Sequence, residues 1–309
     1  MIEIRAGRRS RRNDLPGAAL IGLLLACLSQ SCRHESTVGT RLVHDGLGRP
    51  VEVPLRPRRI VSLAPSVTDS LFALGAEDRV VGVSDFCELP RGSRAITRVG
   101  GLLNPSLETI RSLEPDLLIG TTSGNDPSLG RQAATLGLPL YTLDTPDVER
   151  VLDAIRDLAI LLDEESRGNE RAGHLRARLE AVRARVSKRR PPRVLFIVWG
   201  EPLVVPGGSA FLTDALARSG GDSITADASA AWPSFDVESA IARAPEVILT
   251  TSRNGAFLDR LRHDPAWAGV PAVRTGRLIV VSEAIERPGP RVIAGIEEVA
   301  AALHPVAMN

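Results

Sequence analysis

Two stretches of the chain repeat the same order of residue types about 130 positions apart. In residues 107–119 a glutamate follows an apolar residue, and a proline, an acidic residue and an apolar run come after it; residues 237–249 have the same order. A second pair of matching segments, residues 59–63 and 193–197, is 134 positions apart. Two matches at nearly one offset predict two structural units of similar design.

The residues around each repeat alternate between strand and helix patterns. Short apolar runs bounded by turn residues are typical of buried parallel strands, and segments with helical spacing lie between them. The predicted strands are residues 59–63, 80–83, 116–119, 138–143, 193–197, 247–249 and 276–281. This alternation predicts an α/β fold with two similar Rossmann-like lobes and mostly parallel sheets.

Residues 147–188 differ from both halves because two long helical patterns follow each other. The second has few apolar positions among many arginines and glutamates. At about 23 residues it would span about 35 Å, which suits a rigid connection between two lobes. We therefore predict a first lobe at residues 57–163, one long connecting helix at 164–190 and a second lobe at 191–309.

Residues 1–32 have the composition of a secretory signal peptide. An arginine-rich start precedes an apolar run, residues 15–28, that is shorter than the about 20 residues needed to span a bilayer. The box Leu24-Leu25-Ala26-Cys27 is typical of bacterial lipoproteins and predicts a lipid on Cys27. Cys32 is a weaker candidate, and cleavage without a lipid is the alternative. Residues 33–56 are polar and predict a tether with a short hairpin at 41–53.

The composition argues against several classes of function. The 38 basic and 37 acidic side chains give a formal net charge of +1, so no surface for nucleic acid is expected. Lys188 is the only lysine, which argues against a lysine-dependent phosphate loop or a Schiff-base enzyme. The histidines and cysteines lack metal-ligand spacing, and no nucleophile–base motif occurs. We expect no metal, no prosthetic group and no enzyme activity.

Two tryptophans and one loop are candidates for ligand binding. Trp199 follows the first predicted strand of the second lobe, and Trp232 lies in a loop ahead of the second repeat. Loops beyond the carboxyl ends of parallel strands form the ligand crevice of such folds. Large aromatic side chains there either pack against the fold or cover a flat apolar ligand. The loop at residues 286–291 contains two prolines, so its polar groups would be preorganised for hydrogen bonds to a ligand.

Several segments together resemble one family. The segments are Arg59-Ile60-Val61-Ser62-Leu63-Ala64-Pro65-Ser66 and residues 71–75, 78–83, 85–87, 99–108, 232–233 and 286–291. Through them the chain is similar to the vitamin B12 (cobalamin) binding proteins of bacterial ABC importers over about 250 residues. The opening segments are shared with relatives that bind ferric siderophores or haem, whereas Phe86-Cys87, Trp232 and Glu286-Arg287 favour cobalamin.

The resemblance implies a bilobal fold with little hinge motion and a ligand held between the lobes. Leu102 and Thr121 depart from the family because some members have tryptophan there, and Phe86 lacks a tyrosine hydroxyl. The residues that the resemblance assigns to ligand binding are Ser66, Phe86, Trp199, Trp232, Glu286 and Arg287.

Glu108 and Glu238 match the two surface glutamates with which the family docks on arginines of the permease. Helix geometry supports their exposure, because Leu107 must face the core and Glu108 follows about 100° around the helix. Two matching acidic points would suit a two-fold permease dimer. The alternative is that both glutamates only favour the positive end of their helices.

Three hypotheses remain. The first is a monomeric corrinoid-binding lipoprotein in the periplasm or on the cell surface that supplies an ABC importer. The second is the same scaffold binding haem or a ferric siderophore. The third is an enzyme that uses the cleft between the lobes.

Overall fold

The computed structural model describes residues 39–90 and 92–305. From Gly39 onward the chain forms one compact unit. The predicted signal peptide, including Cys27 and Cys32, lies outside the described residues. None of the described helices is both long enough and apolar enough to cross a membrane.

The first lobe is built on a five-stranded parallel sheet with strand order β5-β4-β3-β6-β7. Its central strands carry almost no exposed surface, as expected for a sheet covered by helices on both faces. The strands are β3 (Ile60–Ser62), β4 (Val80–Val83), β5 (Thr97–Arg98), β6 (Leu117–Thr121) and β7 (Leu140–Leu143), and the helices are α2 (Pro65–Ala73), α3 (Leu107–Ser112) and α4 (Leu129–Thr135).

The second lobe has a four-stranded parallel sheet with strand order β11-β10-β8-β9. Its elements are β8 (Arg193–Ile197), α7 (Phe211–Arg218), β9 (Asp222–Ser223), α8 (Val237–Ala242), β10 (Val247–Thr251), α9 (Gly255–His263), α10 (Pro271–Arg274), β11 (Leu278–Val281), the short 3-10 helix η4 (Glu283–Glu286) and α11 (Val292–Leu303). The predicted α/β fold with two parallel sheets is therefore confirmed.

The sequence repeat is also a structural repeat. Glu114 and Ala244 both have positive φ angles, 45° and 44°, and each precedes a proline. Positive φ is uncommon in residues other than glycine. The shared conformation turns the chain from α3 into β6 and from α8 into β10 in the same way.

An acidic residue after each proline ties the repeated strand to the first strand of its lobe. The carboxylate of Asp116 accepts hydrogen bonds from the backbone N–H groups of Arg58 and Arg59, at 2.7 and 3.0 Å. The carboxylate of Glu246 accepts one from the N–H of Arg193 at 2.9 Å. The residue types that recur in the sequence therefore close equivalent turns.

The hairpin at the start of the described chain belongs to the first lobe. Strands β1 (Thr40–His44) and β2 (Pro50–Pro54) pair antiparallel, close to the predicted hairpin. The N–H of Gly46 donates to the carbonyl of Thr142 in β7 at 2.7 Å. A Cβ on Gly46 would lie 2.4 Å from the backbone nitrogen of Asp144, so this close approach requires glycine. The hairpin within the expected tether at residues 33–56 is therefore packed on the fold, and residues 33–38 of that tether lie outside the described residues.

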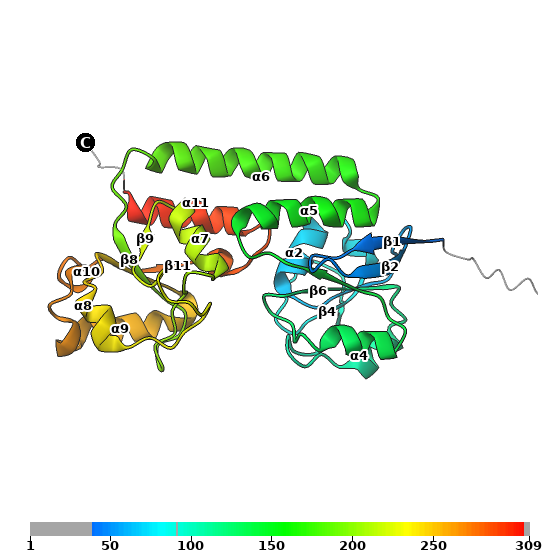
Figure 1. Cartoon of the computed structure of the whole chain (residues 1–309), viewed down its shortest axis with the longest axis horizontal. Coiled ribbons are helices and arrows are strands. Elements are labelled where there is room, and N and C mark those ends of the chain that lie inside the picture. The colour runs from blue at the N-terminus through cyan, green and yellow to red at the C-terminus, as the bar shows by residue number, and fades with distance from the viewer. Residues whose placement is uncertain (1–38, 91, 306–309) are drawn as a thin grey trace, which may run out of the picture. The chain divides into compact units, whose positions relative to one another are not determined.

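One long helix connects the lobes, as Figure 1 shows, and the last helix of the first lobe precedes it. Helix α5 (Val148–Leu162) begins at the N-cap Asp147, and Asp163, with φ of 62°, ends it. Helix α6 (Glu165–Val186) follows and lies along both α5 and α11. Only a thin stripe of α6 is buried, consistent with its few apolar positions, and this stripe consists of Gly168, Ala172, Leu175, Leu179, Val182 and Val186.

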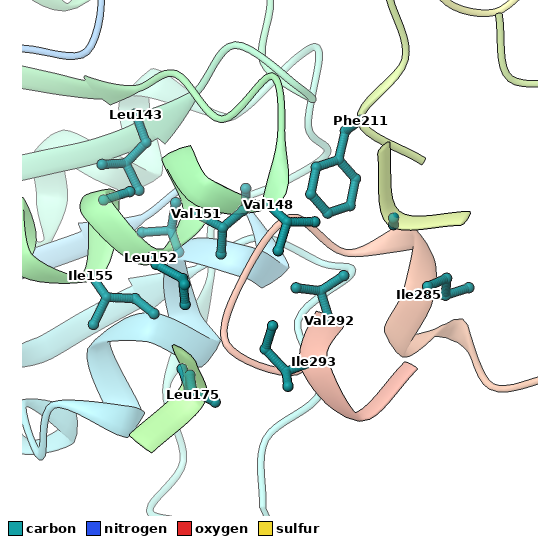
Figure 2. Packing of buried hydrophobic residues seen from close by; sticks show 14 of the residues in the cluster. Leu143, Val148, Val151, Leu152, Ile155, Leu175, Phe211, Ile285, Val292 and Ile293 are labelled. Carbon is teal, nitrogen blue, oxygen red and sulfur yellow. The ribbon is translucent and has the colours of Figure 1, made fainter. Parts of the chain in front are cut away.

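One continuous core joins the lobes. Val148 of α5, Phe211 of α7 and Val292 of α11 belong to the same buried cluster as strands of both sheets. Figure 2 shows these three side chains gathered at the junction between the lobes. The lobes therefore have no water-filled gap at this junction, and a hinge here would have to expose apolar surface.

Substitution of Phe211 tests this shared core. We expect Phe211→Ala to lower the free energy of unfolding by about 3–5 kcal/mol, the usual cost of removing a buried aromatic ring. The three tryptophans all lie in the second lobe and the single tyrosine, Tyr141, in the first. Urea unfolding followed by tryptophan fluorescence and by the NMR signals of Tyr141 should give coincident transitions, with the same loss of stability in the variant.

The matched control is Ile160→Ala on the outer side of α5, where the side chain is 46% exposed and little effect is expected. Separate transitions for the two probes in the natural protein would contradict a shared core.

Candidate ligand-binding cleft

A cavity of about 580 Å³ opens between the two sheets. Its wall is built mainly from loops that follow the carboxyl ends of β3, β4, β6, β8, β10 and β11. This is the crevice in which parallel α/β folds bind ligands. The lining residues are Ala64, Pro65, Ser66, Phe86, Glu88, Leu102, Thr121, Ser123, Gly124, Val198, Trp232, Arg253, Glu283, Glu286, Arg287 and Pro288.

Five of the six predicted ligand-binding residues lie together on this wall. They are Ser66, Phe86, Trp232, Glu286 and Arg287. The sixth, Trp199, is not on the described wall. Its indole Nε1 donates to the carbonyl of Glu201 at 3.0 Å, and a bridge to Val204 turns the chain at this point. These local bonds hold the ring against its own turn, where it stays half-exposed.

Phe86 is presented by a loop that is fixed from behind. The thiol of the next residue, Cys87, is buried and lies 3.1 Å from the hydroxyl of Thr68. The guanidinium of Arg98 donates to the carbonyls of Ser84 and Cys87 at 2.8 and 2.7 Å. With its backbone held in this way, the ring of Phe86 remains 61% exposed.

Trp232 is presented by a second braced loop. The N–H of Gly207 donates to the carbonyl of Ala231 at 2.9 Å, and the N–H of Val205 donates to the carbonyl of Pro233 at 3.2 Å. A Cβ on Gly207 would collide with the carbonyl of Ala230, at 1.9 Å. The Gly207-Gly208 pair thus supports the tryptophan loop, and Trp232 is 50% exposed. Exposed aromatic rings on two rigid loops are suited to cover a flat apolar ligand.

The remaining wall is strongly charged. Arg253 donates to Glu283 at 2.9 Å, and Arg287 donates to Glu88 at 2.6 Å and contacts Glu283 at 3.4 Å. Glu88, Arg253 and Glu283 were missed by the sequence analysis. Arg253 and Glu283 each stand within two residues of the end of a strand, β10 and β11, so their position was the available signal.

The surroundings shift the pKa values of the carboxyl groups on the wall in opposite directions. Burial raises the pKa of Glu286 above its usual range, and Arg253 opposes this only in part. A hydrogen bond from Arg253 lowers the pKa of Glu283. A hydrogen bond from Arg287 likewise lowers the pKa of Glu88. The wall therefore combines ionised carboxylates with one carboxyl group that resists ionisation.

Leu102 and Thr121 also line the cavity. The side-chain amide of Asn125 donates to the carbonyls of Leu63 and Leu102, at 3.0 and 2.9 Å, and so joins this loop to the end of β3. In the second lobe the amide of Asn254 donates to the carbonyl of Val198 at 2.7 Å. The two positions at which some family members have tryptophan are therefore wall positions that here carry smaller side chains.

A family model of periplasmic binding proteins matches residues 60–284, which is most of the chain. The chain belongs to the periplasmic binding protein family. A vitamin B12-binding protein of Vibrio parahaemolyticus serotype O3:K6 is 28% identical over 246 residues, which cover 78% of this chain and 87% of the relative.

Solved structures of other periplasmic binding proteins have the same fold. The periplasmic vitamin B12 binding protein BtuF of Vibrio cholerae superposes with a TM-score of 0.73 at 26% identity, covering 81% of this chain and 98% of that one. The periplasmic heme-binding protein RhuT from Roseiflexus sp. RS-1 gives 0.72 at 28% identity, covering 80% and 97%. Proteins named for two different ligands thus share this scaffold.

Glu108 and Glu238 of this binding protein lie away from the cavity wall, at equivalent helix starts. Ser106 caps α3 by accepting from the N–H of Thr109 at 3.2 Å, and Asp236 caps α8 by accepting from the N–H of Ser239 at 2.8 Å. Both glutamates are exposed in the first turn of their helices. Their predicted exposure is confirmed.

No group of three or more His, Cys, Asp or Glu residues that could hold a metal ion occurs in residues 39–90 and 92–305. The described wall of the cavity also contains no His, Cys, Met or Tyr. The side chains that most often ligate transition metals and haem iron are therefore not part of this wall.

The opposite pKa shifts of Glu286 and Glu283 predict opposite effects of pH on two variants. A carboxyl group with a raised pKa binds its proton more tightly in the folded state, so it lowers stability as pH rises above its ordinary pKa of about 4.3. We therefore compare the free energy of unfolding of Glu286→Gln with that of the natural protein. The difference should favour the variant more at pH 7 than at pH 4. Urea unfolding at both pH values measures this difference.

Glu283→Gln is the matched control. The lowered pKa of Glu283 contributes stability above the ordinary pKa, and this contribution is lost as pH falls through the folded value. The control variant should therefore be relatively less stable at pH 7 than at pH 4. Differences of the same sign in both variants would rule out this account of the wall.

Proposed function

We propose that the protein captures cobalamin or a related corrinoid in the cleft outside the cytoplasm and delivers it to an ABC importer. The observation that carries this proposal is the pairing of exposed aromatic rings with a carboxylate-rich wall around one cavity. The similarity to vitamin B12-binding proteins over most of both chains supports it.

The charges of the wall suit a ligand with neutral amide groups. A corrinoid carries amide side chains, each with N–H donors and a carbonyl acceptor. Carboxylates of Glu283 and Glu286 can accept from the amide N–H groups, and Arg287 can donate to a carbonyl. The two carboxylates of a haem would instead face three acidic side chains on the wall, with only Arg253 and Arg287 as cations.

Haem remains the second candidate, because a heme-binding protein shares the scaffold at 28% identity. Haem iron in proteins is commonly held by His, Tyr, Cys or Met, and the described wall supplies none of these. A corrinoid can carry its own axial base, so it does not need such a side chain. The composition of the wall therefore favours the corrinoid.

The proposed role is binding and delivery, without catalysis. We propose that the mature protein is a monomer held near its permease by a lipid on Cys27. A single acyl chain anchors a protein only weakly, so several chains on one cysteine would be needed for stable attachment.

Removal of the ring of Trp232 tests the cleft. We expect Trp232→Ala to weaken binding of cyanocobalamin by about 2 kcal/mol or more, roughly thirtyfold in Kd, because a desolvated aromatic anchor contributes this much. Isothermal titration with cyanocobalamin, cobinamide and haemin measures affinity and selectivity together. Trp199→Ala is the matched comparison and should have a smaller effect, since Trp199 is not on the described wall.

Tighter binding of haemin than of either corrinoid would favour the second candidate. Equal affinities in the natural protein and the Trp232→Ala variant would show that this ring does not contact the ligand.

We further propose that Glu108 and Glu238 dock on the two halves of a permease dimer. They are exposed at equivalent places of two similar lobes, and neither lies on the cavity wall. A partner with two-fold symmetry presents the same basic patch twice, which two matching acidic points can contact.

Charge reversal at both positions tests docking. Glu108→Arg combined with Glu238→Arg should leave the affinity for cyanocobalamin nearly unchanged but abolish uptake into cells. Reversal of two exposed glutamates on α6, Glu170 and Glu180, serves as a control and should leave uptake intact. Uptake at the normal rate in the Glu108/Glu238 double variant would leave both glutamates with only a local role at their helix starts.

A further inference from the structure

The floor of the cleft is a contact between the lobes. The segment at residues 287–291 of the second lobe lies on the start of α2 in the first. A Cβ on Gly289 would lie 3.0 Å from the carbonyl oxygen of Ser66 and 3.2 Å from its Cα. A side chain at these distances would be crowded against the backbone of Ser66, so the two backbones are closely packed. Prolines at 288 and 290 restrict the segment further.

Ion pairs on both sides of Gly289 strengthen this contact. Arg287 donates through Nη2 to Glu88 at 2.6 Å, and Nη1 of Arg291 lies 3.4 Å from Glu88 and 3.7 Å from Asp69. Both acidic residues belong to the first lobe and both arginines to the second. We call these four residues the clasp.

Arg287 lines the ligand site and is held there by two carboxylates. It lines the cavity, its side chain is only 13% exposed, and its Nη2 is occupied by Glu88 and Glu283. Its Nη1 is buried and has no hydrogen-bond partner among the described residues. A buried donor without a partner is costly, so the ion pairs of Nη2 with Glu88 and Glu283 are what keep the guanidinium in place.

We propose that Glu88 is a positioning residue for ligand binding, which holds Arg287 across the clasp so that its guanidinium, at the cavity wall, meets an acceptor on the ligand. This inference rests on the proposed function and extends it to a residue of the opposite lobe. A guanidinium held at Nη2 presents its remaining N–H groups in a fixed plane, which reduces the entropy lost on binding. An amide carbonyl of a corrinoid is an acceptor of the required kind.

The proposal gives the binding of a neutral ligand an unexpected dependence on salt. Glu88 is 59% exposed, so dissolved ions can weaken its attraction to Arg287. A ligand without net charge would otherwise show little change in affinity with ionic strength. Salt should therefore lower affinity in the natural protein by loosening Arg287, and this effect should vanish when Glu88 carries no charge.

Glu149 provides a matched control. It lies on α5 and pairs with Arg176 of α6 at 2.8 Å and with Arg218 of α7 at 3.2 Å, so it also links elements of the two lobes. A hydrogen bond from Arg176 lowers the pKa of Glu149, just as one from Arg287 lowers that of Glu88. Glu149 does not line the cavity. Its loss should affect stability but not ligand affinity.

The test compares the natural protein, Glu88→Gln and Glu149→Gln by titration with cyanocobalamin at low and high sodium chloride. At low salt Glu88→Gln should bind about tenfold more weakly, equivalent to about 1.4 kcal/mol. Its affinity should not depend on salt, whereas that of the natural protein and of Glu149→Gln should fall toward it as salt rises. Equal affinity in Glu88→Gln and the natural protein, or an unchanged salt dependence, would overturn the proposal.

A second measurement separates this inference from the proposed function. Hydrogen–deuterium exchange of ligand-free protein reports on residues 283–292, where the N–H groups of Arg287, Gly289 and Val292 are hydrogen-bonded. Exchange there should be severalfold faster in Glu88→Gln and unchanged in Glu149→Gln. If the natural protein fails to bind corrinoids, the proposed function fails while this result still stands. Unchanged exchange in Glu88→Gln would overturn the clasp whatever the ligand.

Discussion

The apolar junction between the lobes is the constraint on which the site depends. Val148, Phe211 and Val292 place α5, α7 and α11 in one buried cluster, and the strands of both sheets extend that cluster. Opening the cleft at this junction would expose apolar surface, and this exposure costs about 25 cal/mol of free energy per Å². Any such opening would therefore work against the burial of this cluster.

The charged residues at the floor of the cleft have a different role from this core. Surface ion pairs contribute little to stability, and Glu88 is largely exposed. Their value lies in orientation, because Glu88 of the first lobe and Glu283 of the second both hold Arg287 at the cavity wall. The apolar junction sets the distance between the lobes. The ion pairs set the orientation of the Arg287 guanidinium at that distance.

Sequence patterns predicted the features of the fold that depend on residues close together in the chain. The apolar runs identified the strands, and their carboxyl ends identified loops that form the cavity, so Trp232 and Glu286 could be proposed from the sequence. Phe86 was proposed only from the resemblance to a known family. Glu88 and its partner Arg287 are 199 residues apart, and no local pattern connects them. Trp199 follows a strand as the topology requires, yet hydrogen bonds within its own turn determine where the ring lies.

The residues that recur in both lobes have other roles than the residues found in only one lobe. The shared features, such as the paired turns at Glu114 and Ala244 and the amides of Asn125 and Asn254, build the fold. Glu108 and Glu238 are shared as well, and they are exposed away from the cavity. By contrast, the wall has an exposed phenylalanine from one lobe, and an exposed tryptophan and two arginines from the other. A ligand without two-fold symmetry needs unlike walls, whereas a two-fold partner needs like surfaces. A chain that contacts both kinds of partner would therefore need unlike residues inside the cleft and like residues on the outer surfaces of its two lobes.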